Sequence, residues 1–233
     1  MPRRGDWSDP ERLPRQRKGV TPQMVGRYPD FDVLDPAVAG TWDEATRKVV
    51  LGRVTPSPDL RFFSQEEVPT LRAFTDCLMA QHSEPRVPVV EMIDAKYAEG
   101  RLEGYQYEDV PDDRDLWHEV LRGLQFSAHS RYRRSFAELD LEAQQALCED
   151  LQRGVLQGGP WERFNVKRAF GVVMQTVVTE FYSHPWAWNE IGFGGPAYPR
   201  GFARFGSLDP VEAFEEHDRV GTDVQRELEE HRP

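Results

Sequence analysis

The chain has 233 residues, of which 39% are hydrophobic and 30% charged, and its formal net charge is −11. These proportions are typical of a globular protein that remains in water and argue against a fibrous or wholly disordered chain. The acidic balance argues against a nucleic-acid-binding protein, which needs basic surfaces to neutralise phosphates. The length favours one domain with tails.

The first 63 residues are rich in proline and charge, and we expect them to form an extended arm. Proline fixes φ and removes a backbone donor, so closely spaced prolines disfavour long helices. The arm also contains Trp42 and the apolar run at 48–51, more apolar material than a free tail usually carries. We therefore expect it to wrap along a surface.

Five main helices are predicted after the arm. The first starts at Ser64, where Glu67 completes the spacing of a capping box. The others are expected at 88–100, 114–134, 140–154 and 162–183, each with apolar residues at steps of three and four. The predicted fold is all-α, a single helical bundle in a domain over residues 64–206, with acidic short helices at 207–233.

The pair His184-Pro185 should end the last long helix, because the residue before proline is pushed out of the helical region. A loop rich in glycine, proline and aromatic residues is expected next. Aromatic residues and arginine anchor interfaces, so this loop is the candidate partner interface; packing on its own bundle and a sugar-binding platform are alternatives. The candidate residues are Trp186, Trp188, Asn189, Glu190, Phe193, Tyr198 and Arg200.

Several histidines and carboxylates invite a metal-site interpretation, but their spacing is poor. His118 and His129 are expected on one helix, roughly 16 Å apart at a rise of about 1.5 Å per residue. Neither of these two histidines has a His or Glu four residues away, which is the spacing of helical metal sites. We predict no metal ligand, and the residues considered are His118, Glu119, His129, Glu180 and His184.

The sequence lacks the familiar motifs of cofactor binding, redox chemistry and membrane insertion. The sequence holds no G-x-G-x-x-G after a strand, no phosphate-binding P-loop and no G-x-S-x-G elbow, so no catalytic or cofactor-binding residues are predicted. Cys77 and Cys148 have no C-x-x-C spacing and are expected to be buried and reduced. No apolar run approaches the ~20 residues of a membrane span. Arg3-Arg4 is followed by polar residues, unlike an export signal.

The segment at 180–201 resembles the gluconate 2-dehydrogenase subunit 3 family. Members of that family end their last long helix in a Y-S-H-P-like step and continue with W-N-E-I-G and G-G-P-A-Y-P-R-G, which stand here at 182–185, 188–192 and 194–201. The start of the first helix at 63–67 and the F-A-x-L step at 136–139 are similar to the family as well. The resemblance covers roughly residues 60–205.

This resemblance implies a non-catalytic accessory subunit that binds and stabilises a large flavoprotein of the glucose-methanol-choline (GMC) oxidoreductase type. The partner would carry FAD, oxidise a sugar, polyol or sugar acid, and pass electrons to a cytochrome or another acceptor. We expect a cytoplasmic location, with export as the passenger of a signal-bearing partner as the alternative. The rival functions are a stand-alone saccharide-binding protein or enzyme using the segment 186–190, and an assembly chaperone that releases the flavoprotein.

Overall fold

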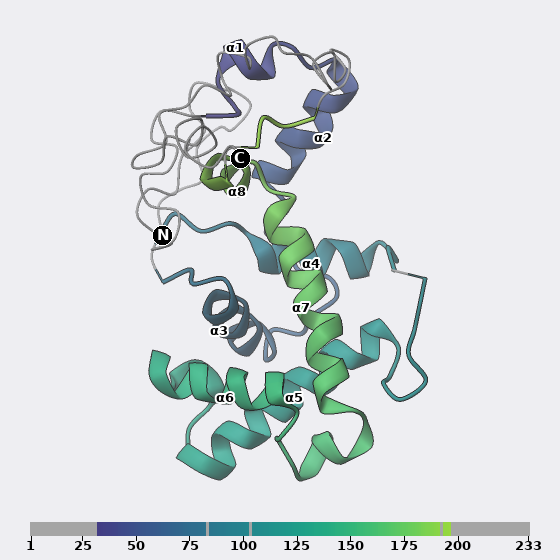
Figure 1. The fold of residues 1–233 in the computed structure, drawn as a ribbon, viewed down its shortest axis with the longest axis vertical. Helices are drawn as coiled ribbons and strands as arrows, with labels where there is room; N and C mark the ends of the chain where they lie inside the picture. The colour runs from purple at the N-terminus through teal and green to yellow at the C-terminus, as the bar shows by residue number, and fades with distance from the viewer. Residues whose placement is uncertain (1–31, 83, 103, 192, 197–233) are drawn as a thin grey trace, which may run out of the picture. The chain divides into compact units, whose positions relative to one another are not determined.

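The computed structural model describes residues 32–82, 84–102, 104–191 and 193–196. These residues form helices and connecting segments, with no strand among them (Figure 1). The predicted all-α fold with about five main helices is confirmed. The chain divides into two compact units, which are described separately below.

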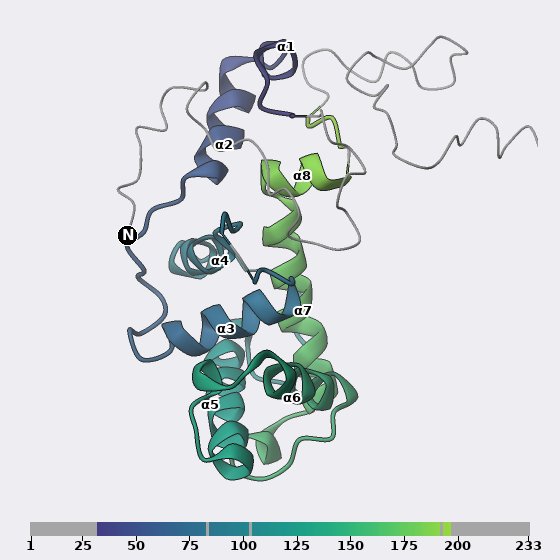
Figure 2. The ribbon, with the colours of Figure 1, turned by 90° about the vertical axis from the view of Figure 1, so that its left-hand side faces the viewer.

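The larger unit consists of residues 56–82 and 87–182. In Figures 1 and 2, α7 runs past α4 near one of its ends and past α5 and α6 near the other. Helix α3 packs against α4, α5 and α6. None of the helices in the described part of the chain is both long and apolar enough to cross a bilayer. The elements are α3 (Val68–Leu78), α4 (Val89–Ala98), α5 (Asp113–Tyr132), η2 (Phe136–Glu138), α6 (Leu141–Arg153), η3 (Gly159–Arg163) and α7 (Val166–Tyr182).

The core of this unit is built from the apolar stripes that the sequence predicts. Trp117, Val120 and Leu124 on α5 are fully buried, as are Val173 and Val177 on α7. Full burial of such side chains stabilises the fold by about 1.5–3 kcal/mol each relative to exposure. The spacing of these residues therefore sets which face of each helix turns inward.

The helix boundaries follow from capping residues. Asp112 accepts hydrogen bonds from the amides of Arg114 and Asp115 at the start of α5, and Asp140 accepts one from Ala143 at the start of α6. Gly154 ends α6 with a φ of 71°, a left-handed conformation that glycine adopts without a Cβ penalty. These ends agree with the prediction to within a residue or two.

The capping box predicted at Ser64 forms only in part. The Glu67 carboxylate accepts a hydrogen bond from the Ser64 amide (3.0 Å), as the motif requires. The Ser64 hydroxyl, however, donates to the same carboxylate (2.8 Å) instead of accepting from the backbone. Helix α3 begins only at Val68, with Pro69 in its first turn, where the missing amide of proline costs no helical hydrogen bond.

The smaller unit consists, in its described residues, of 32–55, 84–86, 183–191 and 193–196. It contains α1 (Pro36–Ala39), α2 (Glu44–Val54) and α8 (Pro185–Ile191). The prediction of an extended arm is wrong for 44–54, because no proline stands between Pro36 and Pro56 and Asp43 caps the helix by accepting from the Thr46 amide (2.8 Å). Residues 1–31 lie outside the described residues.

The predicted loop after His184-Pro185 is also corrected. Proline does end α7, but it then serves as the first residue of α8, because its fixed φ suits a first helical position. The imidazole Nδ1 of His184 accepts a hydrogen bond from the amide of Trp186 (3.1 Å) at this start. The short helices predicted at 207–233 lie outside the described residues.

Candidate functional site

The residues predicted as a partner interface fall mainly on α8, where several are buried within the smaller unit. Trp186 is 6% exposed, and Trp188 and Asn189 are 4% exposed. Glu190 is half-buried, while Phe193 is 46% exposed. Tyr198 and Arg200 lie outside the described residues. The rings of Trp186 and Trp188 are therefore buried, and docking by this segment stays a prediction.

Trp188 belongs to a core built with residues far away in the sequence. Its ring packs with apolar side chains of 33–54. It also contacts the Phe193 ring, edge-on at 5.4 Å, and the Arg53 guanidinium, 6.0 Å from the ring centre. The cluster is Val33, Leu34, Val38, Trp42, Val50, Val54 and Trp188. Segments that the sequence separates by more than a hundred residues thus form one small core.

Asn189 fixes the position of the segment before α1. Its side-chain oxygen accepts a hydrogen bond from the Val33 amide (2.7 Å), and its nitrogen donates to Asp32 (3.1 Å). Buried amides that lose such a partner cost about 1–3 kcal/mol. Asn189 is therefore a structural link between the two parts of this unit.

The histidines and carboxylates considered as metal ligands are dispersed. Among the described residues, no three His, Cys, Asp or Glu side chains stand close enough together to hold a metal ion. Glu180 on α7 instead forms a buried ion pair with Lys96 on α4 (3.8 Å). His129 lies on the same helix as His118 and contacts Gln125 (3.5 Å).

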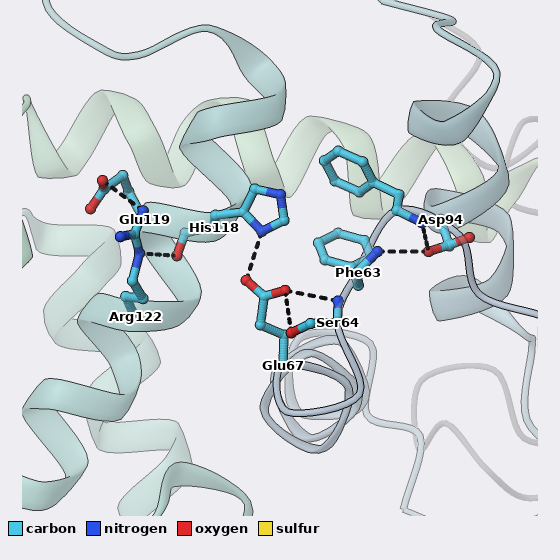
Figure 3. A network of polar contacts seen from close by, with 8 residues as sticks. Phe63, Ser64, Glu67, Asp94, His118, Glu119 and Arg122 are labelled. Atoms are coloured by element: carbon cyan, nitrogen blue, oxygen red, sulfur yellow. Dashed lines mark hydrogen bonds and ion pairs between the residues drawn. The ribbon is translucent and has the colours of Figure 1, made fainter.

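The larger unit has a hollow of about 540 Å³ between α3 and α5. A histidine–glutamate pair lines this hollow, and Figure 3 shows its polar contacts. Nδ1 of His118 lies 2.6 Å from Oε1 of Glu67. Both side chains are largely but not fully buried. The hollow is lined by Ser64, Glu66, Glu67, Thr70, Asp115, His118, Leu121, Arg122 and Gln125.

The chain segment beside this pair is held by a third helix. The buried carboxylate of Asp94 on α4 accepts hydrogen bonds from the amides of Arg61 (2.7 Å), Phe62 (2.9 Å) and Phe63 (2.9 Å). The rings of Phe62 and Phe63 then lie 4.9 and 5.8 Å from the imidazole of His118 (Figure 3). The network therefore connects α3, α4 and α5.

The electrostatics of the pair favour an ionised Glu67. Burial opposes ionisation, but the hydrogen bonds from Ser64 and His118 outweigh it and hold the pKa of Glu67 below its usual value. Because the carboxylate can only accept, Nδ1 of His118 carries the proton of their hydrogen bond. A histidine paired with a carboxylate can transfer protons, but here the ring is flanked by the chain's own phenylalanines.

Comparison with known proteins decides the family. A model of the family described as gluconate 2-dehydrogenase subunit 3 matches residues 65–195, more than half of the chain. The chain belongs to this family. No curated protein and no solved structure gave a match.

Family membership confirms the resemblance carried by the segment at 180–201, of which the match includes the part up to residue 195. The family is named for one subunit of a multi-subunit dehydrogenase, which agrees with an accessory role. The matched residues run from the hollow of Glu67 and His118 through α8. The family region thus includes parts of both units.

Sequence reasoning missed Asp94 and the pair of Lys96 with Glu180. Asp94 stands between Ile93 and Tyr97, which are both fully buried. A carboxylate beside buried positions of an apolar helix needs hydrogen-bond donors to offset its desolvation. The place of Asp94 among apolar residues of a helix could have indicated a buried carboxylate. Its hydrogen-bond donors could not be predicted, because they come from a non-helical segment more than thirty residues earlier in the chain.

Proposed function

We propose that this chain is a non-catalytic accessory subunit that binds and stabilises a large FAD-dependent dehydrogenase of the GMC type. The match of residues 65–195 to the subunit 3 family carries this proposal. The partner would oxidise a sugar, a polyol or a sugar acid, and its own residues would bind FAD. The complex would work in the cytoplasm and deliver electrons to a cytochrome or another acceptor.

The contacts of the histidine–glutamate pair support a structural role for Glu67 and His118. Glu67 ties Ser64 to His118, and Asp94 holds the segment whose rings flank the imidazole. These hydrogen bonds join the start of α3 to α5 and join α4 to the segment before α3. Such a network suits a rigid scaffold that is presented to a partner.

The alternative of a stand-alone saccharide-binding protein or enzyme would need an open aromatic platform at 186–190. Trp186 and Trp188 are 6% and 4% exposed, so their rings offer little surface for a sugar to stack on. Titration of the isolated chain with saccharides, followed by tryptophan fluorescence, tests this alternative. A saturable change would favour it over the accessory role.

Co-expression with a GMC-type flavoprotein from the same organism tests the proposal directly. We expect the two chains to co-elute in size-exclusion chromatography at a fixed ratio, with FAD in the large chain. The flavoprotein expressed alone should lose activity faster on heating or yield less soluble protein. Independent elution of the two chains, with a flavoprotein that is fully stable and active alone, would refute the proposal. A complex seen only before FAD loading would indicate an assembly chaperone.

A further inference from the structure

The connection between α4 and α5 carries two adjacent exposed aromatic side chains. Tyr105 is 70% exposed and Tyr107 is 39% exposed, and their rings meet edge to face at a centroid distance of 5.2 Å. Most other large exposed apolar side chains of the larger unit stand singly on separate elements, as Leu141 on α6 does. Single exposed apolar residues are normal on a protein surface, but tyrosines gathered together are enriched where proteins bind.

These tyrosines stand on backbone that is fixed to the start of α7. Asp109 accepts hydrogen bonds from the Arg168 guanidinium (2.6 Å) and the Asn165 side chain (3.0 Å), and its carbonyl accepts from the Asn165 amide (2.9 Å). The same guanidinium lies 4.6 Å from the centre of the Tyr107 ring. Asn165 also accepts a hydrogen bond from the Arg168 amide (3.0 Å). The contacts therefore bind the connection to a rigid helix.

Such anchoring matters for binding because ordering a flexible loop costs free energy on association. A loop that is already held by a charged hydrogen bond, an amide hydrogen bond and a cation–π contact loses less freedom when a partner covers it. The exposed Tyr105 ring then stands beside Tyr107, whose second neighbour is Arg168. Tyrosine and arginine are the residue types most often found at the energetic centre of interfaces.

A shallow hollow of about 560 Å³ lies beside this loop, and its exposed charges are mainly negative. Glu108 and Glu162 line it with exposed side chains. The carboxylate of Asp109 is paired with Arg168, and Arg163 contacts Glu119 (3.2 Å). The hollow is lined by Glu108, Asp109, Val110, Pro111, Glu162, Arg163, Phe164 and Asn165. The two glutamates would attract a cationic side chain.

We propose that Tyr105, Tyr107 and this hollow, here called the tyrosine surface, form the docking site for the large dehydrogenase subunit. A lysine or arginine of the partner would enter the hollow between Glu108 and Glu162, and an apolar side chain would cover Tyr105. This inference rests on the proposed accessory function, and it identifies the face of the larger unit that the function uses.

The test uses the full chain and the GMC-type flavoprotein with which it co-elutes. Tyr105→Ser and Glu108→Lys should each weaken the complex by about tenfold or more in Kd, as expected for interface anchors. The loss for Glu108→Lys should shrink at high salt, because exposed charges are screened. Leu141→Ser, at a side chain that is 40% exposed on α6, is the matched control and should leave Kd unchanged. Unchanged thermal melting of each variant shows that the fold is intact.

The outcomes distinguish a wrong docking site from a wrong accessory function. If the natural chain binds the flavoprotein and neither Tyr105→Ser nor Glu108→Lys weakens the complex, the docking site lies elsewhere and only this inference fails. A natural chain that does not bind the flavoprotein at all overturns the accessory function with it. If the chain alone forms a dimer that Tyr105→Ser dissociates, the surface joins copies of the chain and the docking proposal is wrong.

Discussion

The amide of Val33 donates a hydrogen bond of 2.7 Å to the side chain of Asn189, although 156 positions separate the two residues. This bond and the shared core around Trp188 fasten the segment before α1 to α8. The smaller unit therefore depends on a contact between residues far apart in the sequence. Its stability should respond strongly to changes at either end of that contact.

Replacing Asn189 should loosen the segment that contains α2. Asn189→Ala leaves the buried Val33 amide without its acceptor, and the expected cost is about 1–3 kcal/mol. Hydrogen exchange of the amides at 33–54 should accelerate, while α5 amides should be unaffected. Asn165→Ala, which removes an exposed asparagine from the larger unit, serves as the control. Unchanged exchange at 33–54 in Asn189→Ala would show that the link contributes little.

The acid sensitivity of the larger unit should depend on Glu67. Its pKa is lowered in the folded state because the hydrogen bonds from Ser64 and His118 outweigh the opposing effect of burial. A depressed carboxyl pKa gives stability that is present above the unfolded pKa and is lost as pH falls through the folded pKa. The loss should therefore occur below the ordinary glutamate pKa of about 4.3.

Urea unfolding of Glu67→Gln across this pH range measures the effect. The variant should be less stable than the natural chain near neutral pH, and the difference should shrink as the pH falls. Glu66→Gln changes a neighbouring glutamate that lines the same hollow. This control variant should lose stability at low pH to the same extent as the natural chain. Parallel pH profiles for the natural chain and Glu67→Gln would contradict the assignment.

Cys77 and Cys148 should differ in reactivity, although both are free thiols. The hydrogen bond from Cys148 stabilises the Cys77 thiolate and lowers the pKa of Cys77. The same interaction, together with burial, raises the pKa of Cys148. Because the thiolate is the nucleophile, iodoacetamide at pH 8 should modify Cys77 first. Peptide mass spectrometry over time measures both rates, and Cys148→Ala, which removes the hydrogen-bond donor, should slow the alkylation of Cys77. Equal rates at both positions would refute this order.

Replacing glycine by alanine should change the stability of the fold in opposite directions at two helical positions, Gly123 and Gly171. A Cβ at Gly123 on α5 would lie 2.4 Å from the ring of Trp161, so Gly123→Ala should destabilise the fold by about 1–3 kcal/mol. Gly171 on α7 faces open space, so Gly171→Ala should stabilise it by about 0.5–1 kcal/mol. Thermal unfolding compares the two variants. If Gly123→Ala is as stable as the natural chain, the Trp161 ring can move aside to make room for the Cβ.

The periodic spacing of apolar residues predicted α4, α5, α6 and α7 and their inward faces. Asp140 and Gly154 identified both ends of α6, because a capping residue acts on amides and carbonyls within one helical turn. At the candidate site the sequence indicated Glu67 and His118 individually. The sequence could not predict that they pair at 2.6 Å, because the pairing depends on how α3 packs against α5.

The sequence by itself determined the helical class, the boundaries of α4, α5 and α6 to within about two residues and, through the string at 180–201, the family. These properties depend on neighbours within a few turns or on residues that follow one another directly. Only the tertiary structure decided that Trp188 is a core residue of the smaller unit and that Tyr105 is exposed. Burial of a large side chain depends on surfaces supplied by distant segments, and local patterns do not encode those surfaces.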